Sequence, residues 1–578
     1  MSGGKIELTE LGEELYRRGE LKVGSLLRVA GESSDFVILT TNAYESNALF
    51  EENSVYLALR KRGLVKKELE NVELSQILMS FSIIGEIDSN SAISKIEYPQ
   101  RPPSPGSPVY QLVEEDRDKL FGGYVEQLEG KENYDAIKDA YKFGGVIGSK
   151  GLDGLILRPY INMHLGIIGT TGSGKSFTTG AIIEKLGLYS YARRHELEDE
   201  STLSLFVFDV HGEYKEYYSK GDRTLENTPY GDLSRGDIRE DIVVLSISGD
   251  GPLIGIDFVY EDYYGLRELY SPSELTDIVL HIYGTTSAGV YKSLLTELFK
   301  LEPEGEEPNI EKDTCSALEI LHRYANGEID ERNVEIGLSE CVENIASYIG
   351  SATPTVRAAK NALNMFFHKI KDVLRTSKKN SNVYGPEKLR ELATSNSLVI
   401  LDLSGTGAKD VDLVVKDLVI SFVLRTLYVS LAEEFFNTKN RVVFVIDEAQ
   451  NFIPARGYGT GAALTKSITR KIASQGRKFG FSLILISQRP SFMDPHTFSL
   501  VNSLIVHRTA MGDAEAITKL FGLPRHLSTV FTNQRTGEAF VFGQLFGGNS
   551  MRIKIRKGID RKIFERIPLG RFFLSSLP

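Results

Sequence analysis

Residues 165–176 read L-G-I-I-G-T-T-G-S-G-K-S, and the order of elements that this run predicts indicates the class of fold. A short apolar segment typical of a buried strand leads into a complete G-x-x-x-x-G-K-S pattern, and a helix is predicted over 177–186. Glycines let successive backbone N–H groups curl around phosphates, and the following helix directs its N-terminus at them. Strand, glycine loop and helix in this order predict a phosphate-binding loop at the edge of a parallel sheet.

The residues of this loop have separate expected roles. Lys175 is expected to reach the β- and γ-phosphates of a nucleoside triphosphate, and the Ser176 hydroxyl to ligate Mg²⁺. We therefore expect ATP and Mg²⁺ as cofactors. The residues expected to surround the nucleotide are Gly169, Thr170, Thr171, Gly172, Ser173, Gly174, Lys175, Ser176 and Phe177.

A second apolar segment ends in two carboxylates. Residues 442–448 read V-V-F-V-I-D-E, so Asp447 and Glu448 come directly after five apolar residues. P-loop hydrolases hold magnesium with a carboxylate on a neighbouring strand and orient the attacking water with a further polar side chain. Asp447 is therefore predicted to hold Mg²⁺, and Glu448 to act as the general base.

Two polar residues flank the next predicted strand. Gln488 follows the apolar segment 483–487 and is expected to sense the γ-phosphate and position water; a solvent-facing loop amide is the alternative. Arg477 lies at the end of the preceding helix, and its planar guanidinium suits insertion across a subunit boundary because it meets phosphate oxygens with two bonds. A helix C-terminus also attracts cations through its dipole, so both interpretations stay open.

A polar cluster follows the predicted strand at 205–208. Asp209, His211 and Glu213 alternate along the chain, so on an extended segment they share one face. Glu213 is a further candidate catalytic group. A metal site is conceivable, but three ligands without a cysteine favour hydrogen bonding near the nucleotide or DNA.

The alternation of apolar strands and helices predicts the α/β class, with a parallel sheet covered on both faces. Far more chain separates residue 208 from residue 398 than a crossover requires, so a domain must be inserted there. A capping box at 271–274, with Pro272 at the first helical position, opens a long region of helical spacing. The strands are expected at 165–168, 205–208, 398–402, 442–446 and 483–487.

Turn and linker residues divide the chain into six predicted segments. Short alternating apolar runs predict a small N-terminal β-barrel, and a proline-rich run at 98–108 predicts an extended linker. The basic run at 552–571 is either a solvated tail or a functional extension. The segments are 1–97, β-rich; 98–144, linker with a helical segment; 145–261 and 381–545, the ATPase core; 262–380, an inserted helical bundle; and 546–578, a basic C-terminal extension.

Composition narrows the class of protein. A chain of 578 residues is too long to fold around one hydrophobic core, so several domains are expected. The net charge of −11 is compatible with a basic surface only if that surface is confined, for example to a channel. Cys315 and Cys341 alone predict no disulfide framework. The polar first residues do not resemble a signal peptide. Charges interrupt the apolar stretch 411–431, which predicts an amphipathic core helix and not a membrane span, so we expect a cytoplasmic protein without membrane insertion.

Four runs of sequence together resemble the archaeal HerA DNA translocases, of the FtsK-HerA branch of P-loop ATPases. The run at 475–490 is the most specific, because generic P-loop proteins do not share it. Weaker similarity at 102–108 and 536–542 extends the likeness over most of the chain. The four runs are G-T-T-G-S-G-K-S at 169–176, F-D-V-H-G-E-Y at 208–214, I-D-E-A at 446–449 and Q-G-R-K-F-G-F-S-L-I-L-I-S-Q-R-P at 475–490.

This resemblance implies a homohexameric ring with an N-terminal barrel, a RecA-like motor carrying a helical insertion, and a C-terminal extension that braces the neighbouring subunit. It implies double-stranded DNA as the substrate and a NurA-type nuclease as the partner in end resection at double-strand breaks. Arg477 is implied to complete the site of the adjacent subunit. That site is implied to contain Lys175, Ser176, Asp447, Glu448 and Gln488.

Two other functions stay open at this point. The chain could pump DNA for another partner, such as a membrane pore or a defence effector, or it could be a scaffold whose ring is held together by ATP. A scaffold does not need a general base, so Glu448 favours turnover. The loops near 456–466 and 491–496 are the candidates for gripping DNA phosphates.

Overall fold

The computed structural model describes residues 3–47, 75–88, 102–116, 142–155, 164–186, 202–214, 242–258, 269–283, 289–300, 316–546 and 550–555, with short gaps inside several of these ranges. The chain divides into two compact units. The first comprises 1–161, 167–185 and 502–564, and the second comprises 162–166, 186–501 and 565–578. Strand β8 (Leu165–Ile168) contributes residues to both.

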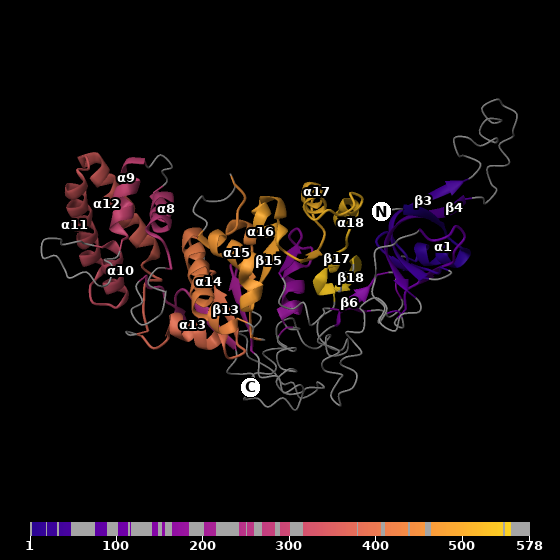
Figure 1. Cartoon of the computed structure of the whole chain (residues 1–578), viewed down its shortest axis with the longest axis horizontal. Helices are drawn as coiled ribbons and strands as arrows, with labels where there is room; N and C mark the ends of the chain where they lie inside the picture. The colour runs from indigo at the N-terminus through magenta and orange to yellow at the C-terminus, as the bar shows by residue number, and fades with distance from the viewer. Residues whose placement is uncertain are drawn as a thin grey trace, which may run out of the picture. The chain divides into compact units, whose positions relative to one another are not determined.

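The first unit begins with a five-stranded antiparallel sheet, in the order β1-β4-β3-β2-β5. Figure 1 shows its two long strands, β3 and β4, side by side. β3 shifts register against β4 at two places, and such irregularities bend a sheet. Thr9 caps the N-terminus of helix α1 (Glu10–Arg17), because its side chain accepts the Gly12 N–H. Closure of this sheet into the predicted barrel stays a prediction. The strands are β1 (Gly3–Glu7), β2 (Leu26–Val29), β3 (Ser34–Asn47), β4 (Ser75–Asp88) and β5 (Val109–Gln111), the last within the predicted linker.

A second group of strands in the first unit pairs antiparallel in the order β16-β17-β18-β6-β7. Two helices, α17 (Met511–Leu520) and α18 (Leu527–Thr532), accompany it. Residues 550–555 form β18, so the sheet continues past the boundary predicted at 546. The strands are β6 (Lys142–Val146), β7 (Asp153–Leu155), β16 (Ser503–Val506), β17 (Glu538–Gly543) and β18 (Ser550–Ile555).

A buried ion pair within this sheet also bonds to the segment that precedes β2. Arg552 on β18 pairs with Glu538 on β17 at 2.5 Å, and it also donates to the carbonyl of Val23 at 2.7 Å. Lys22 pairs with the same Glu538 at 3.1 Å. Arg552 belongs to the basic run read as a tail or extension, but it is buried within the sheet; the rest of that run beyond residue 555 lies outside the described residues.

The second unit has a parallel sheet in the order β12-β11-β10-β13-β9-β14-β15. Its central strands are buried along their length, as expected for a sheet covered on both faces. The strands predicted at 205–208, 398–402, 442–446 and 483–487 are confirmed. The bounds are β9 (Leu203–Asp209), β10 (Ile242–Ser246), β11 (Leu253–Ile254), β12 (Val383–Tyr384), β13 (Leu398–Asp402), β14 (Arg441–Ile446) and β15 (Phe481–Ser487).

Helix α14 (Leu413–Phe435) is buried on nearly every face, which corrects the prediction of an amphipathic helix at 411–431. Its charges have internal partners: Lys416 donates to the carbonyl of Val210 at 3.2 Å, and Asp417 caps another helix. Within the described ranges, no helix is both long and apolar enough to span a bilayer. The neighbouring helices are α13 (Pro386–Ala393), α15 (Leu464–Gln475) and α16 (Pro495–Ser499).

Among the described residues between β11 and β12, five helices pack on one another (Figure 1). All of them fall within the segment predicted as a helical bundle. Cys341 on α11 is disulfide-bonded, a bond that the sequence analysis, which predicted no disulfide framework, did not anticipate. Two cysteines without a framework spacing carry no pairing signal in sequence, because pairing needs the fold to bring them together. The helices are α8 (Pro272–Tyr283), α9 (Gly289–Leu298), α10 (Ala317–Ala325), α11 (Glu331–Ile349) and α12 (Thr353–Ile370).

Candidate functional site

The phosphate-binding loop lies in the first unit, between the last residues of β8 and a helix that begins at Lys175. Gly172 and Gly174 have φ values of 71° and 116°, which residues with a side chain rarely adopt. Ser173 closes the loop, because its N–H and its hydroxyl both bond to the carbonyl of Thr170, at 3.2 and 2.7 Å. The fold therefore uses glycine where the motif has it.

Lys175 provides the positive charge of this loop. The residue is 8% exposed, and its Nζ donates to the carbonyl of Thr170 at 3.2 Å, so the side chain turns back across the loop. Ser176 follows it in the first helical turn, while Thr171 and Phe177 are exposed. An ammonium group, a helix N-terminus and a glycine loop all favour a polyphosphate. These residues fit ATP.

The acidic pair follows β14 in the second unit, and both side chains are buried. Glu448 has φ 48° and ψ 42°, a left-handed conformation that costs a residue with a side chain about 1–3 kcal/mol. Asp447 accepts the N–H of Glu448 at 2.9 Å. Burial, reinforced by the charge of Glu448, raises the pKa of Asp447 to about 8. A buried carboxylate among like charges is well suited to hold a divalent cation, so Asp447 fits Mg²⁺.

Two amide side chains hold the Glu448 carboxylate. Nε2 of Gln488 donates to one of its oxygens, and Nε2 of Gln450 donates to the other. Gln450 is itself held by Ser487, whose hydroxyl donates to Oε1 at 2.7 Å. The sequence analysis named Gln488 but missed Gln450 and Ser487, because no motif marks a glutamine at that position.

The polar cluster after β9 lies near the acidic pair within the same unit. Asp209 is buried, whereas His211 and Glu213 are exposed. The negative charges of Asp209 and Glu213 are among the causes that raise the pKa of Asp447. Among the described residues, no three His, Cys, Asp or Glu side chains are grouped to hold a metal.

Arg477 lies on a short 3-10 helix, η8 (Gly476–Phe479), between α15 and β15, and it is exposed. Just before it, the carbonyl of Ala473 accepts from Nε2 of His164 at 3.1 Å. Nδ1 of His164 accepts the Leu483 N–H at the same distance, so this buried ring joins the end of α15 to β15. An exposed arginine on a fixed turn is compatible with a contact to another subunit.

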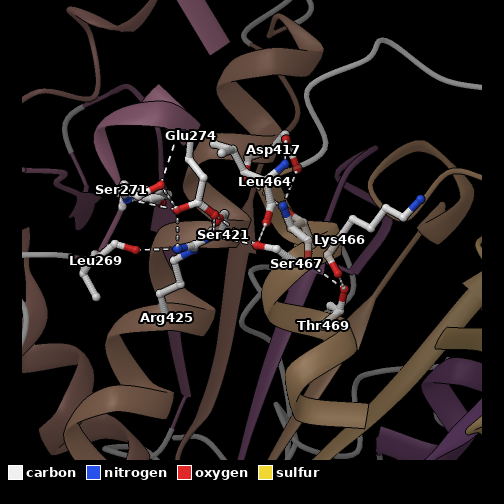
Figure 2. A network of polar contacts seen from close by, with 12 residues as sticks. Leu269, Ser271, Glu274, Asp417, Ser421, Arg425, Leu464, Lys466, Ser467 and Thr469 are labelled. Carbon is white, nitrogen blue, oxygen red and sulfur yellow. Dashed lines mark hydrogen bonds and ion pairs between the residues drawn. The ribbon is translucent and has the colours of Figure 1, made fainter. Parts of the chain in front are cut away.

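The opposite end of α15 is held by α14 and α8 (Figure 2). Asp417 accepts the backbone N–H groups of Leu464 and Thr465 at 2.7 and 3.1 Å, and burial raises its pKa to about 6. Beside it, Arg425 pairs with Glu274 at 2.6 Å. The helix that leads to Arg477 is therefore anchored at its first turn, a contact that the sequence did not reveal.

Replacing Asp417 with alanine is expected to lower the free energy of unfolding by about 1–2 kcal/mol, because two N–H groups of a helix terminus lose their acceptor. Denaturant unfolding followed by circular dichroism measures this change. Asp277→Ala is the matched control, since Asp277 forms an exposed ion pair with Lys292 and such pairs contribute little. Equal unfolding curves for the two variants would contradict the capping role.

The two loops proposed to grip DNA are only partly described. Residues 457–463 lie outside the described residues. Lys466 is engaged internally, because its Nζ donates to the carbonyl of Pro454 at 2.7 Å and pairs with Asp494 at 3.2 Å. The 491–496 loop runs through a 3-10 turn into α16, whose N-terminus Asp494 caps, and His496 is exposed there.

Comparison with known proteins shows the family of this chain. Residues 141–427 match the family model described as the central domain of helicase HerA. A probable helicase of Methanocaldococcus jannaschii is 22% identical over 93% of this chain and 86% of its own length. The DNA double-strand break repair helicase HerA of Sulfolobus acidocaldarius is 22% identical over 91% of this chain and 87% of its own. This chain belongs to the HerA family.

The resemblance read from the four sequence runs is thus confirmed. HerA-family membership makes the chain an ATP-hydrolysing enzyme of the helicase and translocase class. Among solved structures, VirB4 of Thermoanaerobacter pseudethanolicus is similar with a TM-score of 0.43 and 18% identity, covering 72% of this chain and 96% of that one. The plasmid coupling protein TrwB, in complex with a non-hydrolysable GTP analogue, has a TM-score of 0.42 and 14% identity over 70% and 88%.

Proposed function

We propose that this HerA-family chain hydrolyses ATP at sites shared between the subunits of a homohexameric ring and uses that energy to translocate double-stranded DNA. The observation that best supports the proposal is the burial and the backbone conformation of Glu448. It is a buried carboxylate with a left-handed backbone, one residue after the carboxylate that fits Mg²⁺. Backbone strain of this kind persists where the surrounding structure imposes it, and it is concentrated at functional sites.

In the proposed reaction, Lys175 and the loop bind the phosphates, and Ser176 with Asp447 would hold Mg²⁺. A bound Mg²⁺ would neutralise negative charge on the phosphates. Glu448 takes a proton from the attacking water. Gln488, which already bonds to Glu448, orients that water. Glu213 lies near enough to influence Asp447 electrostatically.

Arg477 of a neighbouring subunit would complete each site. Its exposure on η8 leaves the guanidinium available to an adjacent protomer. A cation delivered in trans stabilises the charge that builds on the γ-phosphate, so isolated subunits should be poor ATPases. Closing and opening of the interface with each ATP cycle would move loops that hold DNA.

The remaining parts of the proposal concern fold and partners. We take the second unit together with the phosphate-binding loop as a RecA-like motor, the N-terminal sheet as a barrel, and 556–578 as an extension that braces a neighbour. The printed names of relatives place them in double-strand break repair. We therefore propose a NurA-type nuclease as the partner and end resection as the process, in the cytoplasm.

Linear duplex DNA is expected to stimulate ATP hydrolysis by the wild-type protein, and the DNA concentration needed should rise steeply with salt. Phosphate contacts release counterions, so the logarithm of the affinity falls with the logarithm of salt concentration with a slope of about −0.9 per contacted phosphate. A coupled-enzyme ATPase assay across a salt series measures both effects, with single-stranded DNA of equal length for comparison.

The control for this assay is Lys175→Ala, which removes the phosphate-binding cation and should abolish hydrolysis with or without DNA. Absence of stimulation by any nucleic acid, in a wild-type preparation that still hydrolyses ATP, would overturn the DNA motor. ATP binding that drives assembly without turnover would instead support the scaffold.

A further inference from the structure

His507 is a buried histidine that the proposed reaction does not use. It follows β16, and its exposed fraction is 0%. Its backbone N–H donates to the carbonyl of Ile168 at 2.8 Å, and the next carbonyl, that of Arg508, accepts the Thr170 N–H at 2.9 Å. Residues 507 and 508 therefore run beside the point where β8 enters the phosphate-binding loop.

The imidazole of His507 bridges two elements that lie far apart in the sequence. Nδ1 bonds to the carbonyl of Glu538, the first residue of β17, at 2.9 Å. Nε2 bonds to the hydroxyl of Thr178 at 2.8 Å. Thr178 lies in the first turn of the helix after the loop, where its N–H donates to the carbonyl of Gly174 at 2.9 Å.

The partners determine which nitrogen of His507 carries the proton. A carbonyl oxygen only accepts, so Nδ1 must donate to Glu538; Nε2 of the neutral ring must then accept from the Thr178 hydroxyl. Burial, together with the smaller effect of the Lys175 charge, lowers the pKa of His507 to about 4, so the ring is neutral near pH 7. The ring thus adds no second cation beside the phosphate-binding lysine.

The loop also packs directly on this side chain. A Cβ added at Gly169 would lie 2.7 Å from Cβ of His507, closer than real atoms approach. A Cβ added at Gly174 would lie 3.5 Å from its Cε1. The loop is held further along by Gly537, whose N–H donates to the carbonyl of Ser173 at 3.1 Å. His507 therefore packs closely against both ends of the loop, through its Cβ at Gly169 and through its ring at Gly174.

We propose that His507 is a positioning residue for nucleotide binding: its imidazole holds the first turn of the loop helix, through Thr178, at the place where Lys175 and Ser176 meet the phosphates. It touches no reacting atom, so it acts on ATP affinity and not on the proton transfer at Glu448. This inference deepens the proposed function, because it depends on the loop binding ATP.

The test separates the two bonds of the ring. Asparagine places its amide near the position of Nδ1, so His507→Asn keeps a donor for Glu538 and loses the acceptor for Thr178. Glutamine reaches the position of Nε2, so His507→Gln keeps an acceptor for the Thr178 hydroxyl. Thr178→Val removes that hydroxyl at nearly constant volume, and Thr178→Ser restores it.

We expect His507→Asn and Thr178→Val each to raise the KM for ATP and the Kd of a fluorescent ATP analogue about five- to tenfold, the usual effect of one buried hydrogen bond. The kcat should change by less than about twofold. Thr178→Ser and His507→Gln should recover most of the affinity. The variant that combines His507→Asn with Thr178→Val should lose no more affinity for ATP than either single variant, because both changes remove the same hydrogen bond.

The matched control is Thr518→Val, a buried threonine on α17 whose hydroxyl bonds to the carbonyl of Glu515 in its own helix. This variant should keep the wild-type KM for ATP, and a rise in KM similar to that of Thr178→Val would overturn the proposal. So would a lower melting temperature of His507→Asn with an unchanged KM. If His507→Asn does not fold, the Thr178→Val and Thr178→Ser pair decides by the same criterion. A wild-type protein that binds no ATP defeats the proposed function itself, which is a distinct outcome.

Discussion

Glu448→Gln is expected to reduce the kcat for ATP hydrolysis by about 10²–10⁴ while leaving ATP binding intact, because an amide cannot take the proton of the attacking water. Glutamine has nearly the same shape and also tolerates the backbone position, so the change isolates the proton acceptor. The measurement pairs a steady-state ATPase assay with equilibrium binding of a fluorescent ATP analogue.

The control for this variant is Glu340→Gln, a change of the same type at an exposed position on α11. It should leave both quantities unchanged. Retention of more than about a tenth of the wild-type kcat by Glu448→Gln would show that another group takes the proton, since a general base is normally worth far more. The carboxylate of Glu213 would then be the next candidate.

Arg477→Ala is expected to reduce hydrolysis by about 10³–10⁵, the range observed when an arginine that acts across a subunit boundary is removed. An equal mixture of Lys175→Ala and Arg477→Ala subunits should regain activity beyond either variant alone. In a mixed ring, some sites combine Lys175 from one subunit with Arg477 from its neighbour. Subunits are mixed before assembly, and the ATPase rate is measured per subunit.

The mixing experiment has an internal control in Lys175→Ala with Glu448→Gln. Both residues are proposed to serve the same subunit's site, so every site in that mixture is defective and no activity should return. Lys478→Ala, at the next exposed position, controls for loss of positive charge on η8. If the mixture of Lys175→Ala with Arg477→Ala regains no more ATPase activity than the mixture of Lys175→Ala with Glu448→Gln, Arg477 does not act across a subunit boundary. The same conclusion follows if Arg477→Ala alone is active. Arg477 would then only interact favourably with the dipole at the C-terminus of the preceding helix.

Some elements could be predicted from sequence because their signal is local. The strands β9, β13, β14 and β15 are continuous apolar runs, and burial on both faces of a parallel sheet requires such runs. The strands β11 and β12, the last two on one side of the sheet, have two residues each, too few to show any pattern. Helix α14 was wrongly predicted to be amphipathic, because its charged residues bond to main-chain groups of distant segments inside the protein, and the sequence does not show those partners.

The chemistry of the two motifs follows from the order of residues alone: a lysine and a serine after a glycine loop, and a pair of carboxylates after an apolar strand. Such motifs are readable because each depends on neighbours within a few residues. Only the tertiary structure decided that Glu448 adopts a left-handed backbone, that Gln450 holds its carboxylate, and that His507 reaches Thr178 from 329 positions away. Partners at that separation are set by the order of strands in a sheet, and no local pattern of residues encodes that order.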